Sequence, residues 1–381
     1  MKITRRINYT LILATLCVAL LYVLLYPQKV AAGSAGYGIY VGGQEVTSEN
    51  AASITGSGIS GTISYDHASN TLTLKNATIN KSGFSYLNNK SVFPVSVIGA
   101  RTDSGSTFNI ELIGKNYIKD VTVPSSLPAD ASTNDEYTWK ASKHWGVEIY
   151  GINSKATLAF KGTGSLVIKD SGIEKSISVS DMTINKGSTV ISRDSFIDAT
   201  NVTVEGTLYA ENSKSYGIWA NRIKVSNNGT FTAYGKGGKA AIVNKSLVLG
   251  DKVILKAGTS SSKAYYASKF VEAAYLTAKA GLKISVKPTA LSSLTRAKKG
   301  FNAKWKSLSG IYADGYQIRY SLKSSMNKAK IKTVAGSSKK SLKVRKLKAK
   351  KKYYVQIRAY KKVKGKRYYS SWSAKKKVKT K

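Results

Sequence analysis

The chain is poor in cysteine, histidine and acidic side chains. Its 381 residues include one cysteine, two histidines and twenty Asp or Glu, against sixty-one Lys or Arg. The cysteine, Cys17, lies in an apolar N-terminal segment. A chain from which that segment is cleaved would have no thiol, no disulfide and no cysteine metal site. Two distant histidines, His67 and His144, give no basis for an imidazole metal or acid–base centre. We therefore predict no cofactor and no metal, in an exported protein stabilised by core burial alone.

The N-terminus has the pattern of a signal peptide over residues 1–32. Three basic residues precede an apolar stretch from Leu11 to Leu25, and Val30 and Ala32 suit the small-residue rule for signal peptidase. Cleavage would start the exported chain near Gly33. The alternative is a retained anchor, because Tyr9 to Tyr26 approaches the length of about 18 to 20 apolar residues that spans a bilayer. The predicted location is therefore secreted or at the cell surface.

Positive charge is concentrated at the C-terminal end. Residues 288–381 carry thirty Lys or Arg and a single acid, Asp314, whereas residues 33–287 carry 27 bases and 19 acids. Pro288 stands where the composition changes and is a suitable start for a separate module. We predict a repeat domain over residues 33–286 and a strongly basic domain over residues 287–381.

The basic segment has the alternating apolar pattern of a folded β-sandwich rather than that of a disordered tail. In "GYQIRY" the side chains of Tyr316, Ile318 and Tyr320 point to one face, and "YYVQIRAY" repeats the pattern. Leu347 lies six residues before Tyr353, the spacing of the tyrosine corner in Ig-like sandwiches. On these residues the segment resembles a lysine-rich fibronectin type III module of secreted clostridial proteins, which implies an extracellular Ig-like sandwich.

The middle of the chain repeats with a period of 21 to 26 residues. Each unit has two short alternating apolar segments around a glycine, and successive units open at Gly146, Gly172, Phe196, Gly217 and Ala240. Such a period without helical patterns is typical of a β-solenoid, in which each coil buries its apolar face on the next. The alternative is a sandwich of hairpins. Equivalent positions predict one inward ladder: Phe160, Ile184, Val204, Val225 and Leu249.

The N-terminal end of the repeat region is predicted to carry a cap. The run "TISYDHASNTLTLKNATI" predicts a hairpin within residues 60–80 that closes the open end of the solenoid. This run and "YGIYVGGQEVTSEN" resemble the right-handed β-helix, pectate-lyase-like domains of secreted clostridial proteins. The expected fold class is therefore all-β: a right-handed parallel β-helix followed by an Ig-like fibronectin type III sandwich, in a surface protein of a Gram-positive bacterium.

An insertion loop over residues 119–145 interrupts the repeat and is rich in rings. Long loops in compact domains are usually functional or disordered, and aromatic rings stack on the apolar faces of sugars. The loop predicts a site for cell-wall or host glycans, with these candidates: Tyr137, Trp139, His144 and Trp145. The alternative is that both tryptophans pack under the loop and hold it on the first coil.

Lysines in the basic segment form two groups. Lys348 and Lys350 to Lys352 are expected in the turn before strand F of the sandwich, and Lys361 to Arg367 are expected in the loop after it. A field of this strength attracts anionic polymers such as teichoic acid or extracellular DNA. The candidate polyanion-binding residues are Lys350, Lys351, Lys352, Lys361, Lys362, Lys364, Lys366 and Arg367. The alternative is a solvated surface that keeps the module soluble.

Catalysis is the alternative function. Polysaccharide lyases and glycosidases need clustered carboxylates, and acids recur in consecutive units beside Arg193: Asp181, Asp194, Asp198 and Glu205. Such residues also satisfy turn backbones, and no nucleophile elbow or HExxH motif is present. We name no catalytic residue. We predict an exported surface or matrix protein that binds carbohydrate or anionic wall polymers, with the basic module as tether or spacer; a structural spacer without a ligand is the third possibility.

Overall fold

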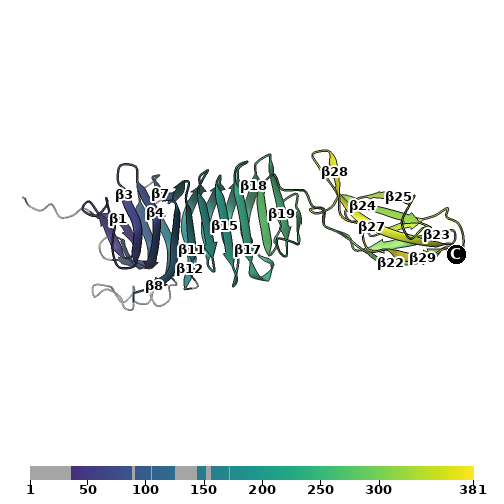
Figure 1. The fold of residues 1–381 in the computed structure, drawn as a ribbon, viewed down its shortest axis with the longest axis horizontal. Helices are drawn as coiled ribbons and strands as arrows, with labels where there is room; N and C mark the ends of the chain where they lie inside the picture. The colour runs from purple at the N-terminus through teal and green to yellow at the C-terminus, as the bar shows by residue number, and fades with distance from the viewer. Residues whose placement is uncertain (1–35, 88–90, 104, 125–143, 152–155, 171) are drawn as a thin grey trace, which may run out of the picture.

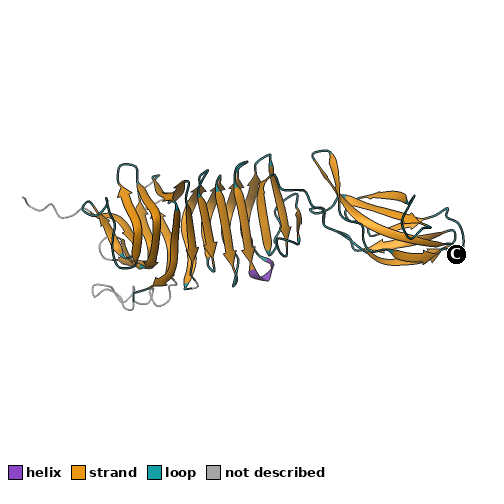
Figure 2. Ribbon diagram, in the orientation of Figure 1, coloured by secondary structure: helices purple, strands orange, loops and turns teal. Residues whose placement is uncertain are grey.

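The computed structural model describes residues 36–381 except 88–90, 104, 125–143, 152–155 and 171. The described residues are almost entirely strands and turns, with one short 3₁₀ turn at Lys236–Gly238 and no α-helix (Figure 2). No helix among them is long and apolar enough to cross a membrane. The molecule is elongated, with a long stack of strands at one end and a smaller sandwich at the other (Figure 1). Each part has its own hydrophobic core.

The N-terminal part is one mixed sheet of twenty-one strands. Their bounds are β1 Gly36–Val41, β2 Gln44–Thr47, β3 Ile59–Asp66, β4 Thr71–Lys81, β5 Gly83–Leu87, β6 Ser91–Thr102, β7 Thr107–Ile113, β8 Lys115–Thr122, β9 His144–Gly151, β10 Thr157–Gly162, β11 Ser165–Lys169, β12 Ile173–Ile184, β13 Thr189–Arg193, β14 Phe196–Val204, β15 Thr207–Asn212, β16 Ile218–Val225, β17 Thr230–Gly235, β18 Ala241–Leu249, β19 Val253–Gly258, β20 Ala264–Tyr266 and β21 Tyr275–Ala280.

Parallel pairing dominates this sheet and follows three strips. The first strip runs through β9 and the N-terminal halves of β12, β14, β16 and β18. The second runs through β7, β10 and the C-terminal halves of the same four strands. The third joins β8, β11, β13, β15 and β17. The chain visits the three strips in turn, so each passage lies beside the previous one.

The predicted ladder is present in the second strip. Phe160 lies opposite Ile184, Ile184 opposite Val204, Val204 opposite Val225, and Val225 opposite Leu249. The first four side chains are fully buried and Leu249 packs partly buried against the same core. Because strands in a sheet are about 4.8 Å apart, each ring or branched chain contacts its equivalents on both sides. The repeat period in the sequence is therefore the period of this pairing.

Tight corners between strips require glycine. Gly162, at the corner between β10 and β11, has φ +84°, and a Cβ there would collide with the carbonyl oxygen of Leu112 in the preceding passage. Both the left-handed backbone and the close approach exclude a side chain. The glycine of each repeat unit thus belongs to a bend.

Antiparallel strands close both ends of the stack. The run predicted as a hairpin forms one: β3 pairs with β4 from Asp66 opposite Thr71 onward. Strand β4 then pairs in parallel with β7 and β8. At the other end β21 lies antiparallel to both β17 and β19.

The C-terminal part is a sandwich of two antiparallel sheets. One contains β22 Leu291–Ala297, β23 Gly300–Trp305 and β26 Ser341–Val344; the other contains β24 Gly315–Ser321, β25 Lys330–Ala335, β27 Lys352–Val363, β28 Lys366–Tyr369 and β29 Lys376–Lys379. Aromatic rings fill the space between them: Trp305 lies 5.2 Å from Tyr316 and Phe301 lies 5.8 Å from Tyr320, measured between ring centroids. The Tyr353 hydroxyl accepts a hydrogen bond from the Lys348 backbone N–H at 3.2 Å, which is the predicted tyrosine corner.

The two parts touch at a short junction. The Ser268 N–H donates to the Ile311 carbonyl at 3.2 Å, and Ile311 and Tyr312 pack against the N-terminal core. Lys364 Nζ donates to the Asp251 carbonyl at 2.8 Å. One end of the sandwich is therefore occupied by the junction, and the opposite end faces away from it (Figure 1).

Candidate functional site

The predicted aromatic insertion lies only partly among the described residues. Tyr137 and Trp139 fall outside them. The prediction of one loop over residues 119–145 was wrong at both ends, because 119–122 belong to β8 and His144 begins β9. The backbone of β9 continues the first strip in register with β12, and Trp145 lies opposite Lys175. Trp145 is thus a strand residue on the outer surface of the sheet.

Trp145 and its neighbours form a polar and aromatic face on the first strip. Lys175 Nζ lies 5.0 Å above the Trp145 ring and donates to Asp198 Oδ2 at 2.7 Å. The lysine and aspartate side chains are 24% and 30% exposed, so this contact is partly screened by solvent. Lys175 therefore contacts both the Trp145 ring on β9 and the Asp198 carboxylate on β14.

Further rings continue this face. Phe196 and Tyr216 meet edge to face at 5.0 Å, and Trp219, which is 42% exposed, lies 6.4 Å from Tyr216. Beside them is a hollow of about 510 Å³ at the corner between the third and first strips; its lining includes Glu174, Asp194, Asn212 and Tyr216. Exposed rings next to hydrogen-bonding side chains are the elements of a carbohydrate-binding surface.

Among the described residues of this strip, Glu148 has a strongly raised pKa. It is 6% exposed, Oε2 has no hydrogen-bond partner among the described residues, and burial raises its pKa to about 8 despite the opposing charge of Lys175. Ser178 lies between Glu148 and Asp198 in register, so the two acids are two strand spacings, roughly 10 Å, apart. Glycosidases use paired carboxyls at similar separation, but Glu148 is enclosed and Asp198 is bound by Lys175.

The acids considered for catalysis lie on different parts of the sheet. Asp181, in the second strip, accepts a hydrogen bond from Asn201 at 2.6 Å, whereas Asp198 faces outward on the first strip. Asp194 occupies a corner with φ +64°, and Glu205 is exposed in the turn between β14 and β15. Among the described residues no group of three His, Cys, Asp or Glu is placed to hold a metal ion.

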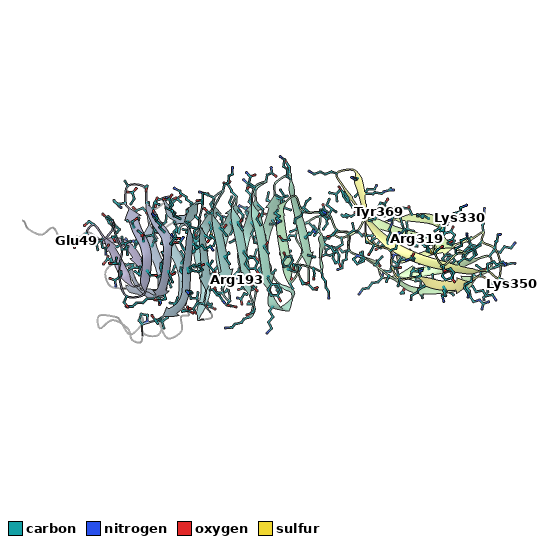
Figure 3. The ribbon with its side chains drawn as sticks, in the orientation of Figure 1. Glu49, Arg193, Arg319, Lys330, Lys350 and Tyr369 are labelled. Carbon is teal, nitrogen blue, oxygen red and sulfur yellow. The ribbon has the colours of Figure 1, made fainter. Side chains whose placement is uncertain are left out.

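The two predicted basic groups lie toward opposite ends of β27. Lys350 and Lys351 are exposed before the strand and Lys352 is its first residue. Lys352 and Lys361 are nine steps apart along β27, so the two groups are separated by roughly 30 Å. Figure 3 shows Lys350 at the outer tip of the sandwich.

The prediction for the second basic group was wrong for Lys361. It was expected in an exposed loop, but it lies within β27 and is 6% exposed. Its Nζ donates to Asp314 Oδ1 at 2.8 Å and to the Gly310 carbonyl at 2.6 Å. The only acid of the module is therefore neutralised by a buried lysine, and Lys361 is unavailable to a polymer.

The rest of that group is partly engaged. Lys362 is exposed but also lies in β27, and Lys364 contacts Asp251 across the junction. Lys366 and Arg367 belong to β28, where they lie 5.7 Å and 5.2 Å from tyrosine ring centroids. These cations border the junction rather than an open end of the sandwich.

Sequence reasoning missed a stack of cations and rings on the outer face of the larger sheet. The guanidinium groups of Arg319 and Arg358 each lie 4.4 Å from the centroid of the Trp372 ring, and that of Arg358 also lies 3.9 Å from the Tyr369 centroid. Gln356 accepts two hydrogen bonds from Arg319 at 2.7 and 2.9 Å. Figure 3 shows Arg319 and Tyr369 on this face.

A cavity at the outer end of the sandwich was also missed. It has a volume of about 410 Å³ and lies between two segments, 320–330 and 346–353, that are distant in sequence. Five lysines line it: Lys323, Lys328, Lys330, Lys346 and Lys348. The sequence shows the lysines, but only the sandwich brings the two segments together.

Comparison with known proteins gives one family. The model of the fibronectin type III domain matches residues 286–375. No curated protein is similar to the chain. Among solved structures, one titled "Myokine structure" is similar at 18% identity over 25% of this chain and 97% of that chain, with a TM-score of 0.21. The C-terminal part, with its two antiparallel sheets and its tyrosine corner, is a fibronectin type III domain.

Proposed function

We propose that the chain is an exported surface or matrix protein of a Gram-positive, clostridial bacterium that binds anionic wall polymers through its fibronectin type III domain. In this proposal residues 1–32 are a cleaved signal peptide, residues 33–286 a right-handed parallel β-helix, and residues 287–381 the basic tether. The parallel strips and the ladder from Phe160 to Leu249 support the β-helix. Its hand follows from the strong preference of parallel crossovers for the right-handed form.

The observation that carries the proposal is the uncompensated charge of this domain. Thirty bases accompany one acid in residues 288–381, and that acid, Asp314, is bound by Lys361. Nearly all remaining lysines of the domain are exposed. A surface of this kind attracts polyanions and releases their counterions on binding.

Salt dependence tests this proposal. The exported chain, residues 33–381, should bind a surface of poly(glycerol phosphate), and the logarithm of its affinity should fall linearly with the logarithm of salt concentration. Five phosphate contacts would give a slope of about 3.5 for a single-stranded polyanion. No binding at 50 mM salt would refute the proposal and leave the domain as a spacer.

Export needs its own measurement. N-terminal sequencing of protein from the culture supernatant should begin at Gly33. Recovery of only the full-length chain in the membrane fraction would establish the apolar segment as an anchor instead.

Carbohydrate binding by the first strip is the second candidate. The exposed ring of Trp219 beside the hollow at Tyr216 favours it. Trp145→Ala and Trp219→Ala should each reduce retention on a neutral glycan array while leaving the melting temperature nearly unchanged. Release of shortened or unsaturated sugars by the parent chain would instead support the lyase or glycosidase alternative.

A further inference from the structure

We infer that the cavity at the outer end of the fibronectin type III domain binds a phosphate-bearing polyol or sugar unit of an extracellular polymer. This inference rests on the proposed function and assigns that function to one site. Apart from Lys348, the residues concerned are different from the two predicted basic groups.

The cavity has the size and chemistry of a small-unit binding site. Its volume of about 410 Å³ lies within the range of ligand pockets, about 300–1,000 Å³. Leu322, which is 45% exposed, and Leu347 provide apolar surface, and Tyr320 and Tyr353 are buried behind them. An apolar wall inside a cationic rim suits a ligand with a carbon skeleton and an anionic group.

The lysines around the cavity carry positive charge that no acidic side chain among the described residues neutralises. These five lysines meet no acid, because Asp314 precedes β24 whereas the cavity lies beyond the C-terminal end of that strand. All five ammonium groups belong to exposed residues. Lysine offers a compact charge with rotatable donors and is a common partner of phosphate groups. The lining therefore suits a phosphate group.

The walls of the cavity are held in place by local hydrogen bonds. Ser321 Oγ donates to the Asn327 carbonyl and accepts from the Lys323 N–H, both at 3.1 Å. On the other side the Tyr353 hydroxyl holds the Lys348 N–H. Lysines on both segments are thus presented from fixed turns.

Two of the lysines occupy backbone positions that disfavour them. Lys328 has φ +53° and Lys346 has φ +59°, in the left-handed region where Asn or Gly is the ordinary choice. The same left-handed backbone occurs at three lysines outside the cavity, Lys299, Lys350 and Lys364, so it does not by itself mark a site. At Lys328 and Lys346 it sets the direction of two side chains that line the cavity.

Nucleic acid fits this site less well. Single-stranded nucleic acid is bound largely by stacking bases on exposed rings, but Tyr320 and Tyr353 are only 5% and 6% exposed. A duplex is too wide to enter a cavity of this volume and could touch only its rim. The ligand that fills the cavity is therefore a small phosphorylated unit or the end of a polymer of such units.

The test replaces the two strained lysines in residues 33–381 by asparagine, Lys328→Asn with Lys346→Asn. The matched control is Lys299→Asn with Lys339→Asn, which removes the same charge from two exposed lysines outside the cavity, the first of them also left-handed. The probes are poly(glycerol phosphate), glycerol 3-phosphate, duplex DNA and oligothymidylate, measured by calorimetry at several salt concentrations.

We expect the cavity variant to bind poly(glycerol phosphate) roughly tenfold more weakly, with a salt slope lower by about 1.4. Its melting temperature should be unchanged or higher, since Asn tolerates positive φ. The control should change affinity much less. Leu322→Ser should also weaken binding of both glycerol phosphate probes without changing the salt slope.

Several results would overturn the inference. Equal losses in the cavity and control variants would spread the contacts over the whole domain, which leaves the proposed function intact but removes the site. If the cavity variant lost affinity for DNA but not for poly(glycerol phosphate), the ligand of the cavity would be nucleic acid instead. Failure of the parent chain to bind poly(glycerol phosphate) at low salt would remove both the site and the proposed function.

Discussion

The two folded regions bury their apolar side chains in different directions. In the N-terminal region strands lie across the long axis of the molecule and stack along it, so that each core residue contacts its equivalent in the next passage (Figure 1). In the C-terminal domain strands run roughly along that axis and two sheets face each other over rings such as Phe301 and Tyr320. One core is a row of similar side chains, and the other is a single cluster of aromatic and aliphatic side chains between two sheets.

Both regions nevertheless place like charges in register. In the third strip of the N-terminal region three cations lie in adjacent strands: Lys119, Lys169 and Arg193. In the sandwich Lys352 lies opposite Lys379. Like charges at opposed positions repel, and exposure to solvent screens them.

The largest loss of stability is expected from a charge placed in the ladder of the second strip. Val204→Asp places a charge between Ile184 and Val225 in a fully buried position and should cost about 5 kcal/mol. Thermal unfolding followed by circular dichroism should lose the N-terminal transition and keep that of the sandwich. The control is Thr203→Asp, which faces outward opposite Lys224 and should be tolerated. A parent-like melt of the Val204 variant would show that the ladder does not support the fold.

A pH-dependent effect should be confined to the N-terminal region. The raised pKa of Glu148 favours its protonated form in the folded state, so the stability it contributes is complete below pH 4.5 and is lost as pH rises toward 8. Glu148→Gln should remove this loss, which amounts to on the order of 4 kcal/mol at pH 8. The quantity to measure is the difference in melting temperature between pH 5 and pH 8.

The control for Glu148 is the exposed Glu205→Gln. It should leave the pH dependence of the parent protein unchanged. If Glu148→Gln and the parent lose stability equally between pH 5 and pH 8, the carboxyl is not desolvated in solution.

An intermediate effect should distinguish the tryptophans of the two regions. Trp372→Ala removes the ring that contacts the guanidinium groups of Arg319 and Arg358 and should destabilise the sandwich by about 2 kcal/mol. Its melting temperature should fall by roughly 10 °C for a domain of this size. Trp219→Ala, which removes a partly exposed ring, should have a much smaller effect. Equal shifts for the two variants would contradict a supporting role for the stack.

The smallest effect concerns the tyrosine corner. Tyr353→Phe deletes the acceptor for the Lys348 N–H and should cost about 1 kcal/mol in urea unfolding. The neighbouring Tyr354, whose hydroxyl has no hydrogen bond among the described residues, is the control, and Tyr354→Phe should be neutral. A neutral Tyr353 variant would mean that water replaces the hydroxyl at no cost.

Local patterns in the sequence determined much of the architecture. Alternation of apolar residues with a period of two selects one face of a strand, and the repeat of 21 to 26 residues sets which residues lie opposite one another. The ladder and the hairpin at residues 60–80 followed from these short-range rules, as did the fibronectin type III domain with its tyrosine corner.

Only the tertiary structure decided which outward side chains meet. Lys361 reads as one more lysine in a basic run, but it is buried because strand β27 carries it to Asp314, 47 positions earlier in the chain. The cavity at Lys328 and Lys346 likewise joins two turns that no local pattern links. Outward-facing residues follow no strict apolar pattern, and their partners depend on how distant strands pair. The sequence pattern therefore predicts which side chains form the cores. The pairing of the sheets decides which side chains meet on the surface.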